Sequence, residues 1–391
     1  MYNARLNRLK KRRAIWLKVH LWLGLSMGLL LSVIGITGSI SVFYQELDQW
    51  FNPGVLSVVP DPRGTLAYKP LQEILDAAAT VAKPSDQRSG IQYPRVEDST
   101  YGVGYIRPAN ADNGTPETWV SIRVNPYTAQ VTGIRTFPLA AGLPPGLIDF
   151  IAVLHYRLLL DDFWGGSIVG FLGIFGIFSA LTGMILWWPL TNRWRQAFTF
   201  KKSTNQKRIN FDIHKIAGFY SCIVLIAVLL SGIYMNFNAK FVGLVQAVSP
   251  KTNQTPVVKI GAPNTRIGLA KAAQIAEDAY PEGEFKWMAD DTGNGLYLFS
   301  RQGVASTSLF WAERIITVEA QTGRIVDVRD ATTRKTAGET FLDWQWPLHS
   351  GKAFGWTGRI LVFISGLVLP ILFITGVIRW LQKRKAKRFA H

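Results

Sequence analysis

Four histidines are the residues of this 391-residue chain best suited to chemistry, because they recur at one fixed spacing. His20 and His214 are 194 residues apart, and so are His155 and His349, while the fifth histidine, His391, ends the sequence. Each member of the two pairs stands at the start of an apolar segment or just ahead of one. A single histidine at such a place is usually interfacial, with its ring reaching water. Four at duplicated positions favour a shared chemical role.

A metal is the role that two facing neutral imidazoles suit best. The chain has one cysteine, Cys222, and few carboxylates near the histidines, which disfavours a tetrahedral zinc site. The apolar segments contain no acid that could form a proton relay. Two histidines do suffice for haem iron, because the porphyrin supplies the other four nitrogens, and helical bundles hold haem between facing side chains. We therefore predict haem ligation by each pair, with hydrogen-bonding or interfacial histidines as the alternative.

Four apolar runs must position these histidines, and each is close to the about 20 residues that a membrane-spanning helix needs. The first is too long for a cleaved signal peptide and is not followed by a small-residue cleavage site. The runs therefore predict a protein that crosses a lipid bilayer four times. They are Trp16–Phe43, Ser167–Trp188, Ile216–Phe237 and Ile360–Trp380.

The histidines belong to a tandem duplication of span, external module and span. The first and third spans share a histidine, a glycine four residues later and a hydroxyl residue followed by glycine, all at identical spacings. The second and fourth spans share a Thr-Gly pair. The matched residues are His20 with His214, Gly24 with Gly218, Thr37-Gly38 with Ser231-Gly232, and Thr182-Gly183 with Thr375-Gly376.

Small residues lie along one face of the first span, at spacings of three and four residues. Such a face indicates either close helix packing or a flat surface against which a planar macrocycle can lie. With His20 on the same helix we favour the second interpretation. The residues are Gly24, Gly28, Ser32, Gly35 and Gly38.

The net charge of +17 would suggest nucleic acid for a soluble protein, but its distribution predicts a membrane topology instead. The segments Met1–Lys18, Pro189–Lys215 and the residues after Ile378 hold twenty basic residues and one acid, Asp212, a net of +19. The remainder has 23 basic and 25 acidic residues, a net of −2. By the positive-inside rule the basic side is cytoplasmic, with both termini inside and the large loops outside. We expect no nucleic-acid partner.

This topology predicts two separate sites at different depths. His20 and His214 begin outward-going spans, so both lie toward the cytoplasm, whereas His155 and His349 precede inward-going spans and lie toward the outside. A span of 20 residues separates these levels by roughly 30 Å. The four histidines can therefore form two pairs but not one site. Arg157 and Lys215, each close in sequence to a histidine, could meet haem propionates.

The two external segments repeat the same order of a helix and then a hairpin. The predicted helices are Leu71–Ala82 and Ile267–Tyr280, because their apolar residues follow the helical period. The predicted strands, which alternate or flank a turn, are Thr118–Val124, Gln130–Thr136, Leu296–Arg301 and Leu309–Val318, with turns at Asn125–Thr128 and Gln321–Gly323.

At this point the residues resemble a known family. The segment Ile15–Pro53, with Trp16, His20-x3-Gly24, Thr37-Gly38 and LDQWFNP at its end, resembles the PepSY-associated transmembrane family of bacteria. The turn motifs VNPYTAQV (Val124–Val131) and VEAQTGRI (Val318–Ile325) look like the closing hairpin of PepSY modules, although Ala129 stands where glycine is usual. The resemblance covers nearly the whole chain.

The resemblance implies an inner-membrane ferrisiderophore reductase of the FoxB type. It implies two haem b groups ligated by His20, His155, His214 and His349, two periplasmic PepSY-like modules, and reduction of a ferric siderophore with electrons from a cytoplasmic or quinone donor. Two alternatives stay open. One is a non-enzymatic PepSY membrane protein that binds peptide or regulates a protease, and the other is a permease component for iron complexes. The lack of broken helices and intramembrane charges disfavours the permease.

The expected fold class is therefore a membrane protein of four transmembrane α-helices from a tandem duplication, plus two periplasmic α+β PepSY-like modules. The expected organisation is a basic cytoplasmic tail (1–15), helix 1 (16–43), module 1 (44–150), a surface helix with transmembrane helix 2 (151–188), a basic cytoplasmic loop (189–210), helix 3 (211–237), module 2 (238–348), helix 4 (349–380) and a basic cytoplasmic tail (381–391).

Overall fold

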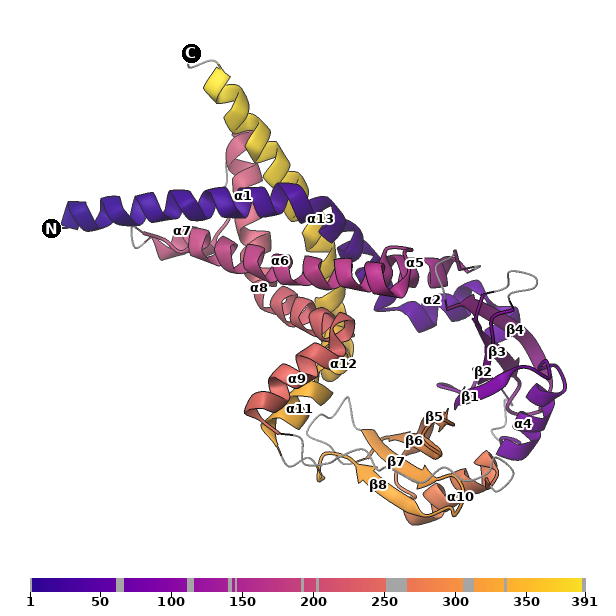
Figure 1. The fold of residues 1–391 in the computed structure, drawn as a ribbon. Coiled ribbons are helices and arrows are strands. Elements are labelled where there is room, and N and C mark those ends of the chain that lie inside the picture. Colours follow the sequence, from indigo (N-terminus) through magenta and orange to yellow (C-terminus); the bar gives the residue numbers. More distant parts are fainter. Residues whose placement is uncertain are drawn as a thin grey trace. The chain divides into compact units, whose positions relative to one another are not determined.

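The chain folds into two compact units, which Figure 1 shows as helices and as a sheet in a computed structural model. The structure describes residues 2–60, 67–110, 116–139, 143–144, 146–190, 193–201, 204–250, 266–304, 313–333 and 336–388. The helical unit comprises Met1–Phe43, Phe150–Leu244 and Trp344–His391, and the sheet unit comprises Tyr44–Asp149 and Val245–Asp343. His391 and the predicted strand residues 309–312 lie outside the described residues.

Four helices of the described chain are long and apolar enough to cross a membrane, as predicted. Each contains one of the four apolar runs, and two of them begin at a capping side chain: Asp161 accepts a hydrogen bond from Trp164 N, and Asn205 from Lys207 N. The helices are α1 (Tyr2–Ser41), α6 (Asp162–Trp187), α8 (Gln206–Asn236) and α13 (Gly355–Arg388).

Glycines set how closely these helices pack. A Cβ atom at Gly35 of α1 would lie 2.5 Å from the carbonyl oxygen of Gly366 on α13, and one at Gly28 would lie 2.4 Å from Phe373. At these two positions the small-residue face is therefore used for close helix packing, and the macrocycle interpretation is wrong there. Gly24 differs, because a Cβ atom there would meet no atom within 4 Å.

Short helices precede α6 and α13 and carry the remaining pair of histidines. His155 lies on α5 (Leu147–Arg157) and His349 on α12 (Gln345–His349), which is followed by the 3-10 helix η2 (Lys352–Phe354). Tight left-handed turns follow both helices, with positive φ at Leu158 and Leu159 and at Gly351. Glycine adopts this conformation at little cost, whereas the two leucines are held in it by the fold. The other short helices of this region are α7 (Trp194–Phe198) and α9 (Asn238–Val248).

The described strands form one antiparallel sheet of eight, in the order β4-β3-β2-β1-β5-β6-β7-β8. The two predicted modules are thus not separate. They join where β1 pairs with β5, with Ile91 opposite Met288. The first module contributes β1 (Gln87–Gln92), β2 (Tyr101–Arg107), β3 (Thr118–Val124) and β4 (Val131–Pro138), and the second contributes β5 (Glu284–Asp291), β6 (Leu296–Gln302), β7 (Glu313–Glu319) and β8 (Ile325–Arg329).

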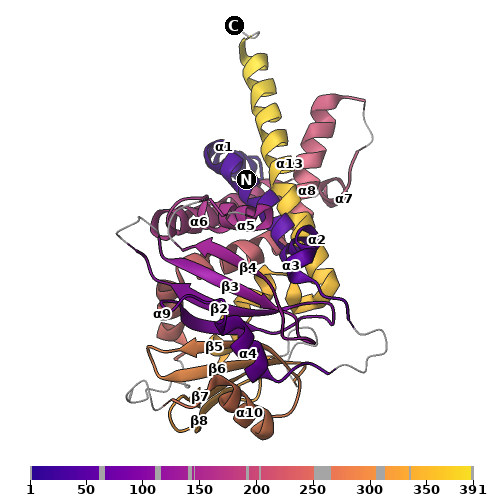
Figure 2. The same cartoon turned by 90° about the vertical axis from the view of Figure 1, so that its right-hand side faces the viewer.

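One hydrophobic core runs beneath both modules. Helices α4 (Leu71–Ala79) and α10 (Leu269–Ala279) pack on the same face of the sheet, as Figure 2 shows. Ile74 of α4 and Ala276 of α10 are fully buried against strand residues such as Val103 and Phe299. The other face of the first module meets α2 (Tyr44–Phe51) and α3 (Pro53–Leu56), and α11 (Ala337–Asp343) follows β8.

The hairpin turns of the two modules keep the same backbone shape with different residues. Gly323 has φ of 75°, and Ala129, at the matching position of the first turn, has φ of 55°. An L-residue is disfavoured in this left-handed region by about 1–2 kcal/mol. Both turns therefore favour glycine at this position, and the first module has alanine there in spite of this cost.

Candidate functional site

The structure brings the four predicted histidines together as two pairs within the helical unit. The ring centres of His20 and His214 are 6.1 Å apart, with an angle of 84° between the ring planes. The ring centres of His155 and His349 are 6.0 Å apart, with an angle of 48°. Each pair takes one histidine from each half of the duplication. Two imidazoles bonded at about 2.0–2.1 Å to opposite sides of one metal ion place their ring centres about 6 Å apart.

The two pairs lie at different levels of the same helices. Helix α1 carries His20 and, 17 residues later, Thr37, which contacts His155. Helix α8 carries His214 and, again 17 residues later, Ser231, which contacts His349. At about 1.5 Å per residue these levels are about 26 Å apart along each helix.

Every histidine ring rests on a Ser-Gly or Thr-Gly pair of a neighbouring helix. The Nδ1 atom of the histidine lies close to the hydroxyl oxygen of this Ser or Thr. The same Nδ1 atom also forms a hydrogen bond with the backbone carbonyl of the residue three positions before that Ser or Thr. The distances to the hydroxyl oxygen are 3.1 Å for His20 and Thr182, 3.4 Å for His155 and Thr37, 2.9 Å for His214 and Thr375, and 3.0 Å for His349 and Ser231. The backbone partners are Ser179, Ile34, Leu372 and Val228.

These contacts assign the tautomer of each ring. A backbone carbonyl can only accept, so Nδ1 carries the proton and donates it. The hydroxyl of Thr182 donates its own proton to Ser179 O, and the hydroxyl of Ser231 donates to Ala227 O, so each hydroxyl oxygen is also an acceptor. Nε2 of each histidine is then unprotonated and can bind a metal, in the manner of ligands oriented by an outer hydrogen bond.

The glycine of each pair lets the ring approach the helix. If each glycine carried a Cβ atom, that atom would lie close to Cε1 of the histidine in contact with it. The distances would be 2.6 Å at Gly38, 3.2 Å at Gly183, 3.3 Å at Gly232 and 3.7 Å at Gly376. The sequence showed these pairs as matched motifs of the duplication. Their role as supports for the histidines becomes visible only when the helices pack.

The residues present fit a planar cofactor better than a bare metal ion. Within the part of the chain that the structure describes, no three His, Cys, Asp or Glu side chains gather as a metal site. Two imidazoles alone leave most coordination positions of a metal unfilled, which a porphyrin would fill. One helix turn after His20 and His214 there is room for a larger group: a Cβ atom at Gly24 would meet nothing within 4 Å, and one at Gly218 would meet only Leu372 at 3.5 Å.

Arg157 and Lys215, predicted to face propionates, are engaged by the protein itself. The Arg157 side chain is 2% exposed and donates from Nη1 to Asp162 Oδ1 at 2.7 Å. Lys215 Nζ donates to the carbonyl oxygens of Gln196 and Thr199 and pairs with Asp212 at 3.0 Å. Their contact with a cofactor stays a prediction.

Arg379 is a cation beside the pair of His20 and His214, called the inner pair below, with His155 and His349 as the outer pair. The sequence did not single Arg379 out. It lies on α13 one turn after Thr375, and its guanidinium is 4.2 Å from the ring centre of Phe211, three residues before His214. No carboxylate of the described chain lies within ion-pair distance of it. In the sequence, Arg379 is one of six basic residues after Ile378 and is not distinguished from the others by type. Its spacing of four from Thr375 was the signal that could have singled it out.

Met288 of β5, a residue type that can serve as an axial haem ligand, is part of the sheet core. It is 2% exposed, and its sulfur lies 3.7 Å from the hydroxyl of Tyr93. The described residues of the sheet unit include no histidine.

Four membrane helices with paired histidines, together with a sheet unit made of two α+β modules, define a membrane protein with PepSY-like modules. The family described as the PepSY-associated TM region matches residues 17–383, so the chain belongs to this family. Among curated proteins, none matches this sequence.

Proposed function

We propose that this protein carries electrons across the bacterial inner membrane through two haem b groups and reduces a ferric siderophore in the periplasm. The observation that supports this proposal most strongly is the presence of two histidine pairs. In each pair the ring centres are about 6 Å apart, and each ring is held through its Nδ1 atom. His20 and His214 would ligate the haem on the cytoplasmic side, and His155 and His349 the haem on the periplasmic side. Bound haem would supply reversible one-electron chemistry at its iron.

The chain's own groups would bind and orient the two cofactors. The Ser-Gly and Thr-Gly pairs hold each ring with Nε2 free, and Arg379 offers a positive charge for a propionate at the inner site. The apolar helices around the histidines exclude water. In this proposal both termini are cytoplasmic, the sheet unit is periplasmic, and a cytoplasmic or quinone donor supplies the electrons.

Reduction would release iron because of ligand preference. Siderophore oxygens are hard ligands that hold Fe(III) more strongly than the softer Fe(II). One electron delivered to the ferric complex therefore weakens its iron binding, and the released Fe(II) becomes available for uptake.

Absorption spectra of the purified protein test the proposal. We expect a Soret band, a reduced spectrum typical of bis-histidine ligation, and about two haems per chain. Reconstituted vesicles with an internal reductant should reduce an external ferric siderophore. A protein without a Soret band after haem supplementation would instead support a binding or regulatory role. If the protein binds two haems but reduces no external ferric complex, the electrons must pass to a different acceptor.

A further inference from the structure

Helix α7 is a short helix in the loop that joins the membrane helices α6 and α8 (Figure 1). The last carbonyl groups of a helix have no partners within the helix. At the end of α7, four consecutive carbonyl oxygens accept hydrogen bonds from side chains of α6 and α8, which fixes α7 to both spans. The bonds are Lys215 Nζ to Gln196 O at 2.7 Å and to Thr199 O at 3.0 Å, Trp187 Nε1 to Ala197 O at 3.1 Å, and Tyr220 Oη to Phe198 O at 3.3 Å.

Aromatic packing holds α7 against the same two spans. The rings of Trp187 on α6 and Phe219 on α8 are stacked, with centres 4.1 Å apart and an angle of 18° between the ring planes. Phe198 of α7 meets both rings edge-on, with its centre 5.1 Å from each. Because α7 joins two membrane-spanning helices and packs against both, it lies at a surface of the membrane.

The side of α8 that holds α7 differs from the side that carries His214. At about 100° per residue, Phe219 and Tyr220 lie about 140° and 240° around the helix from His214. The ring of His214 instead meets Thr375 of α13 and the ring of His20. The surface around α7 is therefore separate from the histidine pairs.

The outward surface around α7 combines exposed aromatic rings with exposed basic side chains. Trp188 is 56% exposed and Tyr220 is 63% exposed. Aromatic rings with a polar atom are enriched at the level of the lipid headgroups, where one end of the ring is in lipid and the other in water. We call this surface the α7 patch, and it consists of Trp188, Phe198 and Tyr220 together with Arg193, Arg195 and Lys201.

The three basic side chains of the α7 patch have no acid to bind. Within the described part of the chain, none of the three takes part in an ion pair. Asp212 is the one acid between Pro189 and Lys215, and it is fully buried. Its carboxylate pairs with Arg208 and Lys215. The positive charge of the α7 patch therefore remains available to an anion outside the chain.

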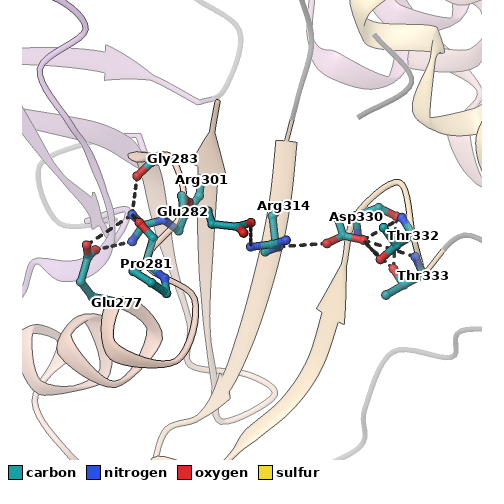
Figure 3. A network of polar contacts seen from close by, with 9 residues as sticks. All are labelled: Glu277, Pro281, Glu282, Gly283, Arg301, Arg314, Asp330, Thr332 and Thr333. Atoms are coloured by element: carbon teal, nitrogen blue, oxygen red, sulfur yellow. Dashed lines mark hydrogen bonds and ion pairs between the residues drawn. The ribbon is translucent and has the colours of Figure 1, made fainter. Parts of the chain in front are cut away.

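Arginines of the sheet unit show the opposite arrangement. In Figure 3, Arg301 contacts Glu277. Arg314 contacts Glu282 at 3.2 Å and Asp330 at 2.9 Å in the same view. The chain thus supplies acids to these arginines and supplies none to the cations of the α7 patch.

We propose that the α7 patch binds an anionic phospholipid, with its three cations at the phosphate and its aromatic rings against the glycerol backbone and the upper acyl chains. Arginine binds phosphate oxygens two at a time, and basic residues beside a membrane helix attract anionic lipids. A free phosphate would use the cations but leave the rings exposed to water, whereas a lipid satisfies both. The lipid site needs no haem and is independent of the proposed function.

Native mass spectrometry of the full chain in a nonionic detergent tests the lipid site. The probes are phosphatidylglycerol and phosphatidylcholine with the same acyl chains. We expect one phosphatidylglycerol to bind about tenfold more tightly than phosphatidylcholine. The combined variant Arg193→Gln, Arg195→Gln and Lys201→Gln should lose this preference. The matched control removes three exposed positive charges from α1, through Lys10→Gln, Lys11→Gln and Arg12→Gln, and should keep it.

Thermal unfolding shows whether the same residues serve the fold. Without lipid, the triple variant of the α7 patch should melt at the wild-type temperature, and added phosphatidylglycerol should raise the melting temperature of the wild type and the control only. A lower melting temperature of the triple variant with an unchanged lipid preference would overturn the proposal. Equal loss of preference in both triple variants would indicate attraction by net charge and would also overturn it. Displacement of the lipid by millimolar glycerol phosphate would assign the cations to a free anion instead.

Discussion

The two halves of this chain agree closely in the helical unit and diverge in the sheet unit. Each histidine and each Ser-Gly or Thr-Gly support is present in both halves, whereas the face of the first module opposite its core has glycine and arginine where the second has leucine and threonine. The difference follows from how each site is built. A histidine pair needs one ring from each half, so a change in either half removes the whole site. A residue on the face of one module opposite the core has no counterpart to pair with in the other half, so the two modules are free to differ there.

Removing one histidine should have the largest effect and tests whether each pair needs a ring from both halves. His20→Ala and His214→Ala should each abolish the inner haem and leave about one haem per chain, because ligation needs both imidazoles. His155→Ala and His349→Ala should do the same to the outer haem. Haem content per protein, measured with the reduced spectrum, gives the result, and His391→Ala is the matched control that keeps both haems. Loss of all haem on any single change would indicate one shared site.

Replacing the glycines that contact the histidine rings should have an effect that grows as the distance between the added Cβ atom and the ring becomes shorter. Gly38→Ala should reduce haem binding at the outer site about tenfold or more, since its Cβ atom would lie 2.6 Å from the His155 ring. Gly376→Ala should leave the inner site nearly unchanged, because 3.7 Å is an ordinary contact. Haem titration of the two apo-proteins measures both affinities. Equal losses would mean that the glycines serve helix packing and not ring placement.

Arg379 and Lys215 should separate into a cofactor role and a structural role. Arg379→Leu should lower the midpoint potential of the inner haem, because a lost positive charge disfavours the added electron. Lys215→Leu should leave that potential unchanged and lower the melting temperature, because buried Asp212 loses a partner. Spectroelectrochemical titration and thermal unfolding of both variants provide the two readouts. A shift in potential for Lys215→Leu alone would restore the propionate role predicted from sequence.

The smallest effect should come from the two hairpin turns. Ala129→Gly should stabilise the β3–β4 hairpin by about 0.5–1 kcal/mol, because glycine accepts positive φ without a Cβ clash. Gly323→Ala should destabilise the β7–β8 hairpin by about 1 kcal/mol or more, since its Cβ atom would also lie 2.8 Å from Ile275. Hydrogen exchange of the hairpin amides measures both changes. The same sign for both substitutions would show that the two turns are not equivalent.

Sequence patterns predicted the parts of the fold that depend on local order. The four spans, both helices of the modules and the strand Thr118–Val124 follow from apolar length and periodicity, and the predicted ends of helices and other strands shifted by a few residues. The strands β1, β2, β5 and β8 were not predicted. Gly90, Gly102 and Gly104 weaken the alternating pattern in β1 and β2. The pairing of β1 with β5 joins residues about 200 positions apart, which no local pattern encodes.

The candidate site was predictable where the duplication made it visible. Equal spacing singled out the four histidines, and their depth followed from the order of the spans. The supports for Nδ1 and the position of Arg379 depend on which helix faces come together.

The pairing of β1 with β5 also sets the order in which the chain can be completed during synthesis. The pairing partner of β1 begins at Glu284, about 190 residues after β1 ends at Gln92. At the usual translation speed of about 5–20 residues per second, the newly made β1 waits about 10–40 s for it. During that time two more membrane helices must be inserted, and β1 is an unpaired edge strand open to pairing with another nascent chain. Until the second module has been made, the sheet of the first module therefore ends at an exposed strand, which favours contact between neighbouring copies made at the same time.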